Sequence, residues 1–129
     1  MFRAKMRCRN PIEFSKGNAG VVKKVSVLQE KNRLSTTVFN AEEFLYGLRL
    51  LGKEEKTVKG ISMLGRLKIH AYTEEELDAA VKLKLELKRS GQAIGKYDEN
   101  IAAICIAKNE KLFTLNKKHF SRIRGLALV

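Results

Sequence analysis

Apolar residues recur at helical spacing in several stretches of this chain, and short β-prone runs separate those stretches. Val21, Val25 and Leu28 lie on one side of a helix predicted over residues 21–31. Residues 34–37 are β-prone and predict a short strand directly after it. The pattern therefore favours a fold that mixes helices and strands.

Asn40 followed by Glu43 matches a capping box, in which a side chain at the start of a helix and an acid three residues later each accept a backbone N–H. This pattern predicts a helix that begins at Asn40 and ends at Gly52, a residue type that readily adopts the left-handed conformation at helix ends. A second helix is predicted over residues 54–64, and a strand over residues 67–71.

Thr73 with Glu76 repeats the capping-box pattern and predicts a helix that stops at Gly91. Asp98 then opens an apolar, alanine-rich helix, which leads into a short strand ending near Thr114. Helices and strands thus alternate, and the economical architecture is α/β: a three-layer sandwich with a central parallel sheet covered by helices. At 129 residues the chain is predicted to form one domain, residues 1–129.

Lys and Arg number 26 against 14 Asp and Glu, which leaves a net charge of +12. This charge attracts polyanions, so nucleic acid is the natural partner, although the solvated surface of a heat-adapted protein explains the composition equally well. No apolar run approaches the ~20 residues of a membrane span, which favours a cytoplasmic protein with no membrane partner. Cys8 and Cys105 lack metal-binding spacing, so we expect core thiols and no zinc.

Two acidic motifs carry the candidate chemistry. Glu43 precedes a Leu-Tyr-Gly sequence by a few residues, and Asp98 opens the alanine-rich helix that leads to Thr114 and Asn116. In their order and spacing these segments resemble PIN-domain nucleases, in particular the VapC-type toxins. The resemblance extends over nearly all of the chain and implies a PIN-like fold.

The resemblance implies a metal site built from Glu43 and Asp98. Their carboxylates would hold Mg²⁺ or Mn²⁺, with the two groups on the order of 4 to 6 Å apart. By the same resemblance, Asn116 would hold a water or a phosphate, and the hydroxyl of Thr114 would support it. The plain alternatives are that Glu43 only closes a capping box and that Asp98 is only a helix N-cap.

The implied function is that of a metal-dependent endoribonuclease of toxin–antitoxin systems, in which a divalent cation activates water and offsets charge on the RNA phosphodiester. Such toxins pair as homodimers and bind an antitoxin protein. The apolar stripe of Leu77, Val81 and Leu85 exceeds what one core needs and also favours a partner. The alternative is a catalytically inactive PIN-fold module that binds RNA or a protein.

The start of the chain departs from the PIN pattern, because a PIN domain normally opens with a buried strand that ends in Asp-Thr or Asp-Ser, and that Asp is the first metal ligand. Arg7 stands about where the Asp is expected and Cys8 about where the hydroxyl residue is expected. Three explanations stay open: a frame or start error in the sequence, an edge strand or disordered arm over residues 1–11, or an arginine that replaces the metal. As written, the chain is expected to cleave RNA poorly or not at all.

The two histidines are candidates of lower rank. His119 is a candidate general base, because the ordinary pKa of histidine is near neutrality, but a surface residue is commoner at this place in the family. His70 lies in the strand predicted over residues 67–71, and we expect a core or edge histidine there instead of a metal ligand.

Overall fold

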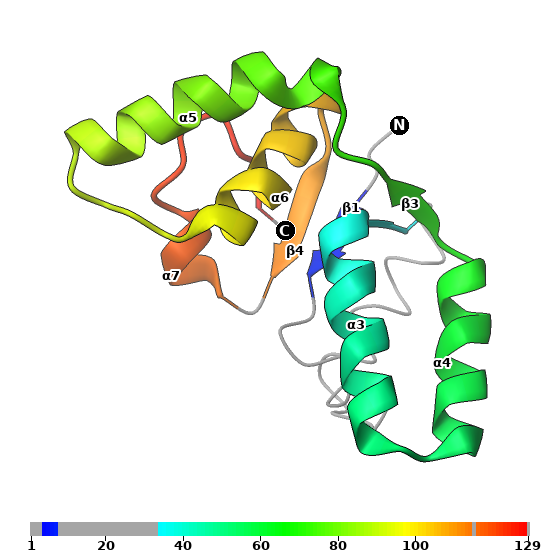
Figure 1. Cartoon of the computed structure of the whole chain (residues 1–129). Coiled ribbons are helices and arrows are strands. Elements are labelled where there is room, and N and C mark those ends of the chain that lie inside the picture. The colour runs from blue at the N-terminus through cyan, green and yellow to red at the C-terminus, as the bar shows by residue number, and fades with distance from the viewer. Residues whose placement is uncertain (1–3, 8–33, 115, 129) are drawn as a thin grey trace.

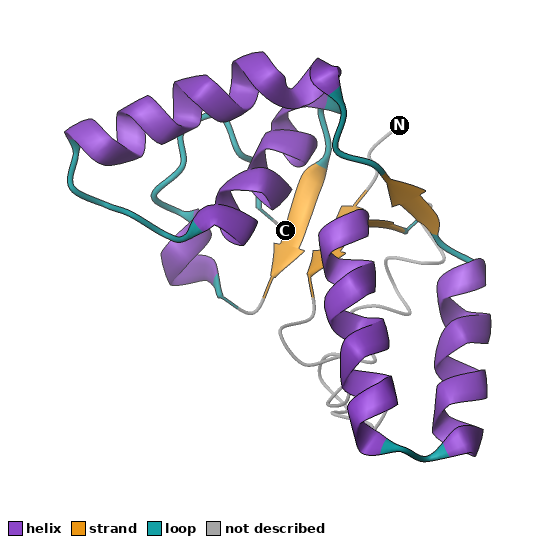
Figure 2. Cartoon of the chain, in the orientation of Figure 1, coloured by secondary structure: helices purple, strands orange, loops and turns teal. Residues whose placement is uncertain are grey.

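A four-stranded parallel sheet forms the centre of the protein in a computed structural model, which describes residues 4–7, 34–114 and 116–128 (Figure 1). The strands are β1 (Ala4–Arg7), β2 (Ser35–Thr37), β3 (Lys68–His70) and β4 (Lys111–Thr114), in the order β3-β2-β1-β4. Helices flank this sheet, as the colouring by secondary structure shows (Figure 2). The predicted α/β class with a parallel sheet and covering helices is confirmed. The predicted helix over residues 21–31 lies outside the described residues, as does Cys8.

The N-terminal strand β1 is an inner strand of the sheet. It pairs in parallel with β2 on one side and with β4 on the other, and in the second pair Arg7 lies opposite Thr114. Of the three explanations left open for the start of the chain, an edge strand or disordered arm therefore does not fit residues 4–7. The alternation of polar and apolar residues suggested a strand with one wet face, but the backbone pairing places it in the middle.

The helices α3 (Val38–Leu51) and α4 (Glu54–Gly65) form an arm beside the sheet (Figure 1). The predicted start of α3 at Asn40 is wrong by almost one turn, because the hydroxyl of Thr37 caps the helix and accepts the backbone N–H of Asn40 at 3.2 Å. The predicted end is confirmed, since Gly52 adopts the left-handed conformation with φ 66°.

The two helices of the arm share a small core of their own, formed by Ala41, Phe44, Leu48 and Leu64. Gly60 of α4 permits a close approach there, because a Cβ atom at this position would lie 2.3 Å from Leu48 Cδ1. The missing side chain thus allows the two helices of the arm to pack tightly.

The next segment begins with a one-turn 3₁₀ helix (Glu74–Glu76) and continues as α5 (Leu77–Arg89). The predicted capping box is confirmed: Glu76 Oε2 accepts the Thr73 backbone N–H at 2.8 Å and the Thr73 hydroxyl at 3.0 Å. The predicted stop is also confirmed, because α5 ends at Arg89 and Gly91 then takes a φ of 66°.

Helix α6 (Lys96–Ala107) lies in the main core, against α5 and β4. It is followed by a tight turn at Asn109, where φ is 51°, so that β4 runs back in the opposite direction. A short helix α7 (Lys117–Phe120), which the pattern did not predict, follows β4. Within the described ranges, no helix combines the length and apolar character that a membrane crossing requires.

The capping box offers a test of the fold. Thr73→Ala should lower the free energy of unfolding by about 1 kcal/mol, because it removes the hydroxyl that caps the turn before α5. Chemical denaturation of the variant and of the unmodified protein would measure this. Thr57→Ala is the matched control, because the Thr57 hydroxyl donates to a carbonyl oxygen within the arm. This variant should leave the protection of the α5 amides from hydrogen exchange unchanged.

The same box should also make stability depend on pH. Burial raises the pKa of the Glu76 carboxyl, but hydrogen bonds from Thr73 and the nearby charge of Lys108 outweigh burial and hold that pKa below its usual 4.5. The stabilisation is therefore complete above about pH 4.5 and is lost as the pH falls through the lower, folded-state pKa. Glu76→Gln should be less stable than the unmodified protein at pH 7, and the gap should narrow below pH 4.5; a gap independent of pH would contradict the assignment.

Candidate functional site

The strand order creates a switch point between β1 and β4. From β1 the chain adds β2 and then β3 on one side, whereas β4 lies on the other side. Ligands of open parallel sheets bind outside the carboxyl ends of the strands at such a point. Arg7 and Thr114, which are register partners, are the last residues of β1 and β4. We call this place the carboxyl edge.

Asp98 reaches the carboxyl edge because α6 runs opposite to β4, so that the start of the helix lies near the end of the strand. The residue is 7% exposed, and Asp98 Oδ2 lies 3.1 Å from His119 Nδ1. The interpretation of Asp98 as only an N-cap is wrong, because Gly95 with φ 95° holds that position. Asp98 is thus a buried carboxylate held by a histidine.

Thr114 and Asn116 meet at the same edge. Thr114 is 2% exposed, and its hydroxyl oxygen accepts the backbone N–H of Asn116 at 3.0 Å. The side-chain Nδ2 of Asn116 is buried and has no hydrogen-bond partner among the described residues. Leaving a buried polar group unsatisfied costs about 1–3 kcal/mol, so an oxygen atom of a ligand would be stabilised at this amide.

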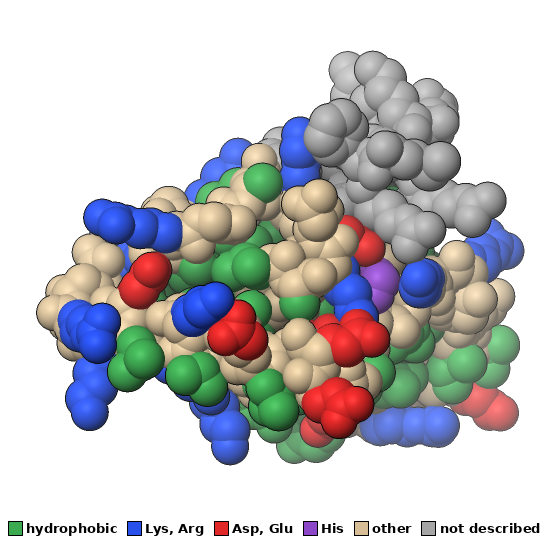
Figure 3. All heavy atoms as spheres, turned by 90° about the horizontal axis from the view of Figure 1, so that it is seen from above, with side chains coloured by type: hydrophobic (Ala, Val, Ile, Leu, Met, Phe, Trp, Pro, Cys, Tyr) green, Lys and Arg blue, Asp and Glu red, His purple; other side chains and the backbone are tan. Residues whose placement is uncertain are grey.

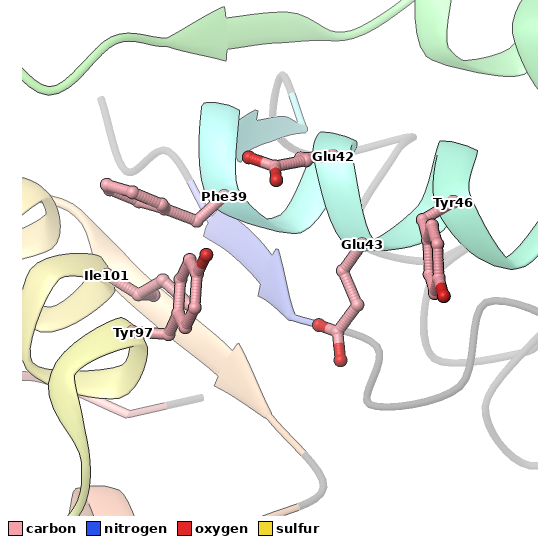
Figure 4. Close-up of a pocket in the computed structure, with 6 residues that line it drawn as sticks. All are labelled: Phe39, Glu42, Glu43, Tyr46, Tyr97 and Ile101. Carbon is pink, nitrogen blue, oxygen red and sulfur yellow. The ribbon is translucent and has the colours of Figure 1, made fainter.

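Glu43 lies on the arm, in a cavity beside α6. It belongs to a cavity of about 340 Å³ between α3 and α6, whose lining residues are Phe39, Glu42, Glu43, Tyr46, Tyr97 and Ile101. In Figure 4, Glu43 extends from α3 in the direction of the end of β1. Since α3 begins at Val38, Glu43 lies well inside the helix and cannot close a capping box with Asn40, so that interpretation is wrong.

Tyr97 and Ile101 link the cavity to Asp98, because they flank it on α6. Aromatic rings form part of the wall: Phe39 contacts Tyr97 edge to face, with ring centroids 5.6 Å apart. The apolar spacing in the sequence did not reveal these rings as site residues, since Phe39 and Tyr97 come from helix starts almost sixty residues apart. Glu42 lines the cavity as well, so the preference for Glu43 stays a prediction.

The two histidines have different surroundings. His119 is partly buried and contacts Asp98. The sequence favoured a surface residue as the commoner case at this position. His70 is 5% exposed, and its Nε2 lies 3.0 Å from Glu110 Oε1, while the Ser35 hydroxyl donates to the other oxygen of Glu110. The expectation of a core or edge histidine at position 70 is confirmed. Cys105 is fully buried in α6, as expected for a core thiol.

The donor set determines which metal the site suits. Among the described residues, no group of three or more His, Cys, Asp and Glu side chains converges on one point. The carboxyl edge offers the carboxylate of Asp98 and the amide of Asn116, with Glu43 in the adjoining cavity. These hard oxygen donors fit Mg²⁺ or Mn²⁺, because Mg²⁺ keeps several waters when only one or two carboxylates bind it. The 4 to 6 Å separation of the two carboxylates stays a prediction.

A family model of the PIN domain matches residues 14–126. Among curated proteins, Ribonuclease VapC1 of Methanocaldococcus jannaschii is 31% identical over 102 residues, which cover 78% of this chain and 72% of that protein. Ribonuclease VapC2 of Rickettsia felis is 30% identical over 105 residues, covering 81% of this chain and 78% of the relative.

Solved structures of VapBC proteins are also similar to this chain. A chain in the crystal structure of VapBC2 from Rickettsia felis bound to a DNA fragment from its promoter has a TM-score of 0.85 and 26% identity, with 100% of this chain and 98% of the other covered. VapBC-1 from nontypeable Haemophilus influenzae has a TM-score of 0.79 at 24% identity, covering 100% of this chain and 97% of that one, and supports the fold alone.

Metal binding offers a test of the site. Adding Mn²⁺ at about 100 times its dissociation constant should raise the free energy of unfolding by ~2.7 kcal/mol, because the ion binds only the folded state. Glu43→Gln and Asp98→Asn should each remove most of this gain, whereas the matched variant Glu42→Gln should keep it. Chemical denaturation with and without Mn²⁺ measures the effect. Equal losses in the Glu42 and Glu43 variants would contradict the choice of Glu43.

Proposed function

Because this chain belongs to the PIN-domain family, we propose that it is a metal-dependent endoribonuclease of the toxin–antitoxin type. The observation that carries this proposal is the position of Asp98, Thr114 and Asn116 at the carboxyl edge, where Asp98 contacts His119 and Thr114 contacts Asn116. Relatives that are 30% and 31% identical are named ribonucleases, which supports RNA as the substrate. The net charge of +12 suits a polyanion.

The chain's own residues take distinct roles in this proposal. Glu43 and Asp98 would hold Mg²⁺ or Mn²⁺, and such a cation supplies activation of water and neutralisation of phosphate charge. His119 fixes the orientation of the Asp98 carboxylate through the 3.1 Å contact. The buried amide of Asn116 donates to a phosphate oxygen, and Thr114 holds the backbone of Asn116 in place. The burial of Asp98 strengthens these interactions by limiting the access of water.

Protein partners form a second part of the proposal. The VapBC2 structure of Rickettsia felis supports an antitoxin as a partner of this chain. The predicted apolar stripe on α5 is exposed, with Leu77, Val81 and Leu85 at 54%, 56% and 44%. Burying such a stripe is favourable, which supports a homodimer or an antitoxin contact on this face. We place the protein in the cytoplasm, where RNA is available to it.

An inactive PIN-fold module that binds RNA is the second candidate. The register of β1 favours it, because Arg7 lies opposite Thr114 at the carboxyl edge, where the family is expected to supply a carboxylate. Without that carboxylate the site has less negative charge to attract a divalent cation. This candidate predicts RNA binding without cleavage.

The missing carboxylate leads to a test by substitution. The unmodified chain should cleave RNA slowly, and Arg7→Asp should raise the rate of Mn²⁺-dependent cleavage at least about tenfold, which corresponds to ~1.4 kcal/mol. Adding Asp98→Asn to that variant should abolish cleavage without lowering the free energy of unfolding, because removing one of several crowded carboxylates relieves repulsion. Gel analysis of labelled RNA measures both rates.

The site assignment would be wrong if the unmodified chain cleaved RNA rapidly with metal and Asp98→Asn left that rate unchanged. If instead RNA binds tightly but no variant cleaves it, the inactive module is the correct function.

The aromatic wall of the cavity gives a separate prediction. If Tyr97, which is 60% exposed, stacks on an RNA base, Tyr97→Ala should weaken the binding of single-stranded RNA by about 1–3 kcal/mol. Tyr97→Phe keeps the ring and serves as the matched control, with binding close to that of the unmodified protein. Fluorescence anisotropy without divalent metal measures both. Equal losses in the two variants would point to the hydroxyl group and contradict stacking.

A further inference from the structure

We infer that a second pocket, formed by Arg89, Arg122 and Arg124, is a phosphate-binding subsite for the RNA backbone. We call it the arginine pocket. This inference rests on the proposed function in one respect, namely that RNA is the ligand. The pocket lies where the end of α5 meets the chain that follows α7, outside the cavity between α3 and α6.

The charges of the arginine pocket are poorly compensated. It has a volume of about 360 Å³, and its lining residues are Glu86, Arg89, Ser90, Gln92, Arg122 and Arg124. Three arginines thus share the pocket with one carboxylate. Within the described ranges, none of the three forms an ion pair. Such a concave group of arginines attracts an anion.

Arg122 is already positioned for this role. Its Nη1 donates to the carbonyl oxygen of Ala93 at 3.4 Å, which ties the guanidinium to the loop before α6. Arginine has five N–H groups in a planar fork, so the remaining groups can bind two oxygens of one phosphate. Holding the side chain in advance lowers the entropy lost on binding.

A short segment of the chain connects the arginine pocket to the candidate active site. Arg122 follows His119 by three residues, and its backbone N–H donates to the His119 carbonyl oxygen at 3.4 Å. The Cα atoms of these residues are therefore at most ~11 Å apart. His119 in turn contacts Asp98. A chain of RNA cleaved at Asp98 would pass the arginine pocket within a few nucleotides.

The surface around the pocket suits a repeated anion more than a single acidic side chain. Lys117 and Lys118 are exposed on α7, directly before His119, and continue the positive charge toward the carboxyl edge. Seen from above, Lys and Arg side chains surround the end of the molecule where α5 ends, whereas acidic groups gather closer to its start (Figure 3). A nucleic acid backbone supplies phosphates at regular spacing along such a strip.

The test is RNA binding in the full chain without divalent metal, so that no RNA is cleaved. The variant Arg89→Gln/Arg122→Gln/Arg124→Gln should bind single-stranded RNA at least tenfold more weakly at low salt. The slope of log K against log salt should become shallower by about 2, because each lost phosphate contact contributes ~0.7. Glu86→Gln, which removes the one acid of the pocket, should tighten binding.

A control variant removes the same number of positive charges at a place distant from the arginine pocket. Lys53→Gln/Lys56→Gln/Arg66→Gln alters three exposed residues in or beside α4, a helix at the other end of the molecule (Figure 1). It should weaken binding much less and leave the salt slope nearly unchanged. Similar losses of RNA affinity in both triple variants would mean that net charge alone governs binding, and would overturn the arginine pocket as a phosphate-binding subsite.

The outcomes separate this inference from the proposed function. Cleavage of RNA by an active variant, together with unchanged RNA affinity after removal of the three arginines, would leave the nuclease and overturn the pocket. Arginine-dependent RNA binding, together with no Mn²⁺-dependent cleavage by the Arg7→Asp variant, would support the pocket and overturn the nuclease. Loss of affinity for an acidic partner protein, with RNA affinity retained, would also overturn the pocket as an RNA subsite.

Discussion

The burial of the middle of α6 is the constraint on which the rest of the structure depends. Ala102, Ala103, Ile104 and Cys105 are completely inaccessible to solvent, and Ile101 is nearly so. Two consecutive alanines let the helix lie close to its neighbours, and a well-packed core leaves no room for it to rotate or slide. The first turn of this immobile helix carries Asp98. The position of the carboxylate is therefore a result of core packing and does not depend on a flexible loop.

Much of the fold could be predicted from local patterns in the sequence. The strand before α3, the capping box at Thr73 and the glycine stops at Gly52 and Gly91 each depend on a few neighbouring residues, and each was found where expected. The start of α3 was misplaced because Thr37 and Asn40 are both good caps, and only the end of β2 decides between them. The place of β1 in the sheet could not be predicted, since strand order depends on pairing between distant segments.

The residues of the candidate site could be named from the sequence, whereas their geometry could not. Asp98, Thr114 and Asn116 were named from the resemblance to PIN domains, and in the structure all three lie near the carboxyl edge. The contact of His119 with Asp98 depends on a short helix after β4, which has too few residues for a periodic signal. The arginine pocket could not be predicted either, because Arg89 belongs to α5, whereas Arg122 and Arg124 follow α7. Charge that is spread along a sequence says little about where it gathers in space.

The pairing of β1 with β4 also sets the time at which the site can exist during synthesis. Met6 lies opposite Phe113, roughly a hundred residues later in the chain, so this pair is among the contacts of longest range in the protein. A chain emerging from the ribosome at about 5–20 residues per second must wait several seconds between making β1 and making β4. The carboxyl edge between these two strands is therefore absent for most of the synthesis of the chain. Any chemistry at this edge must therefore wait until β4 has joined the sheet.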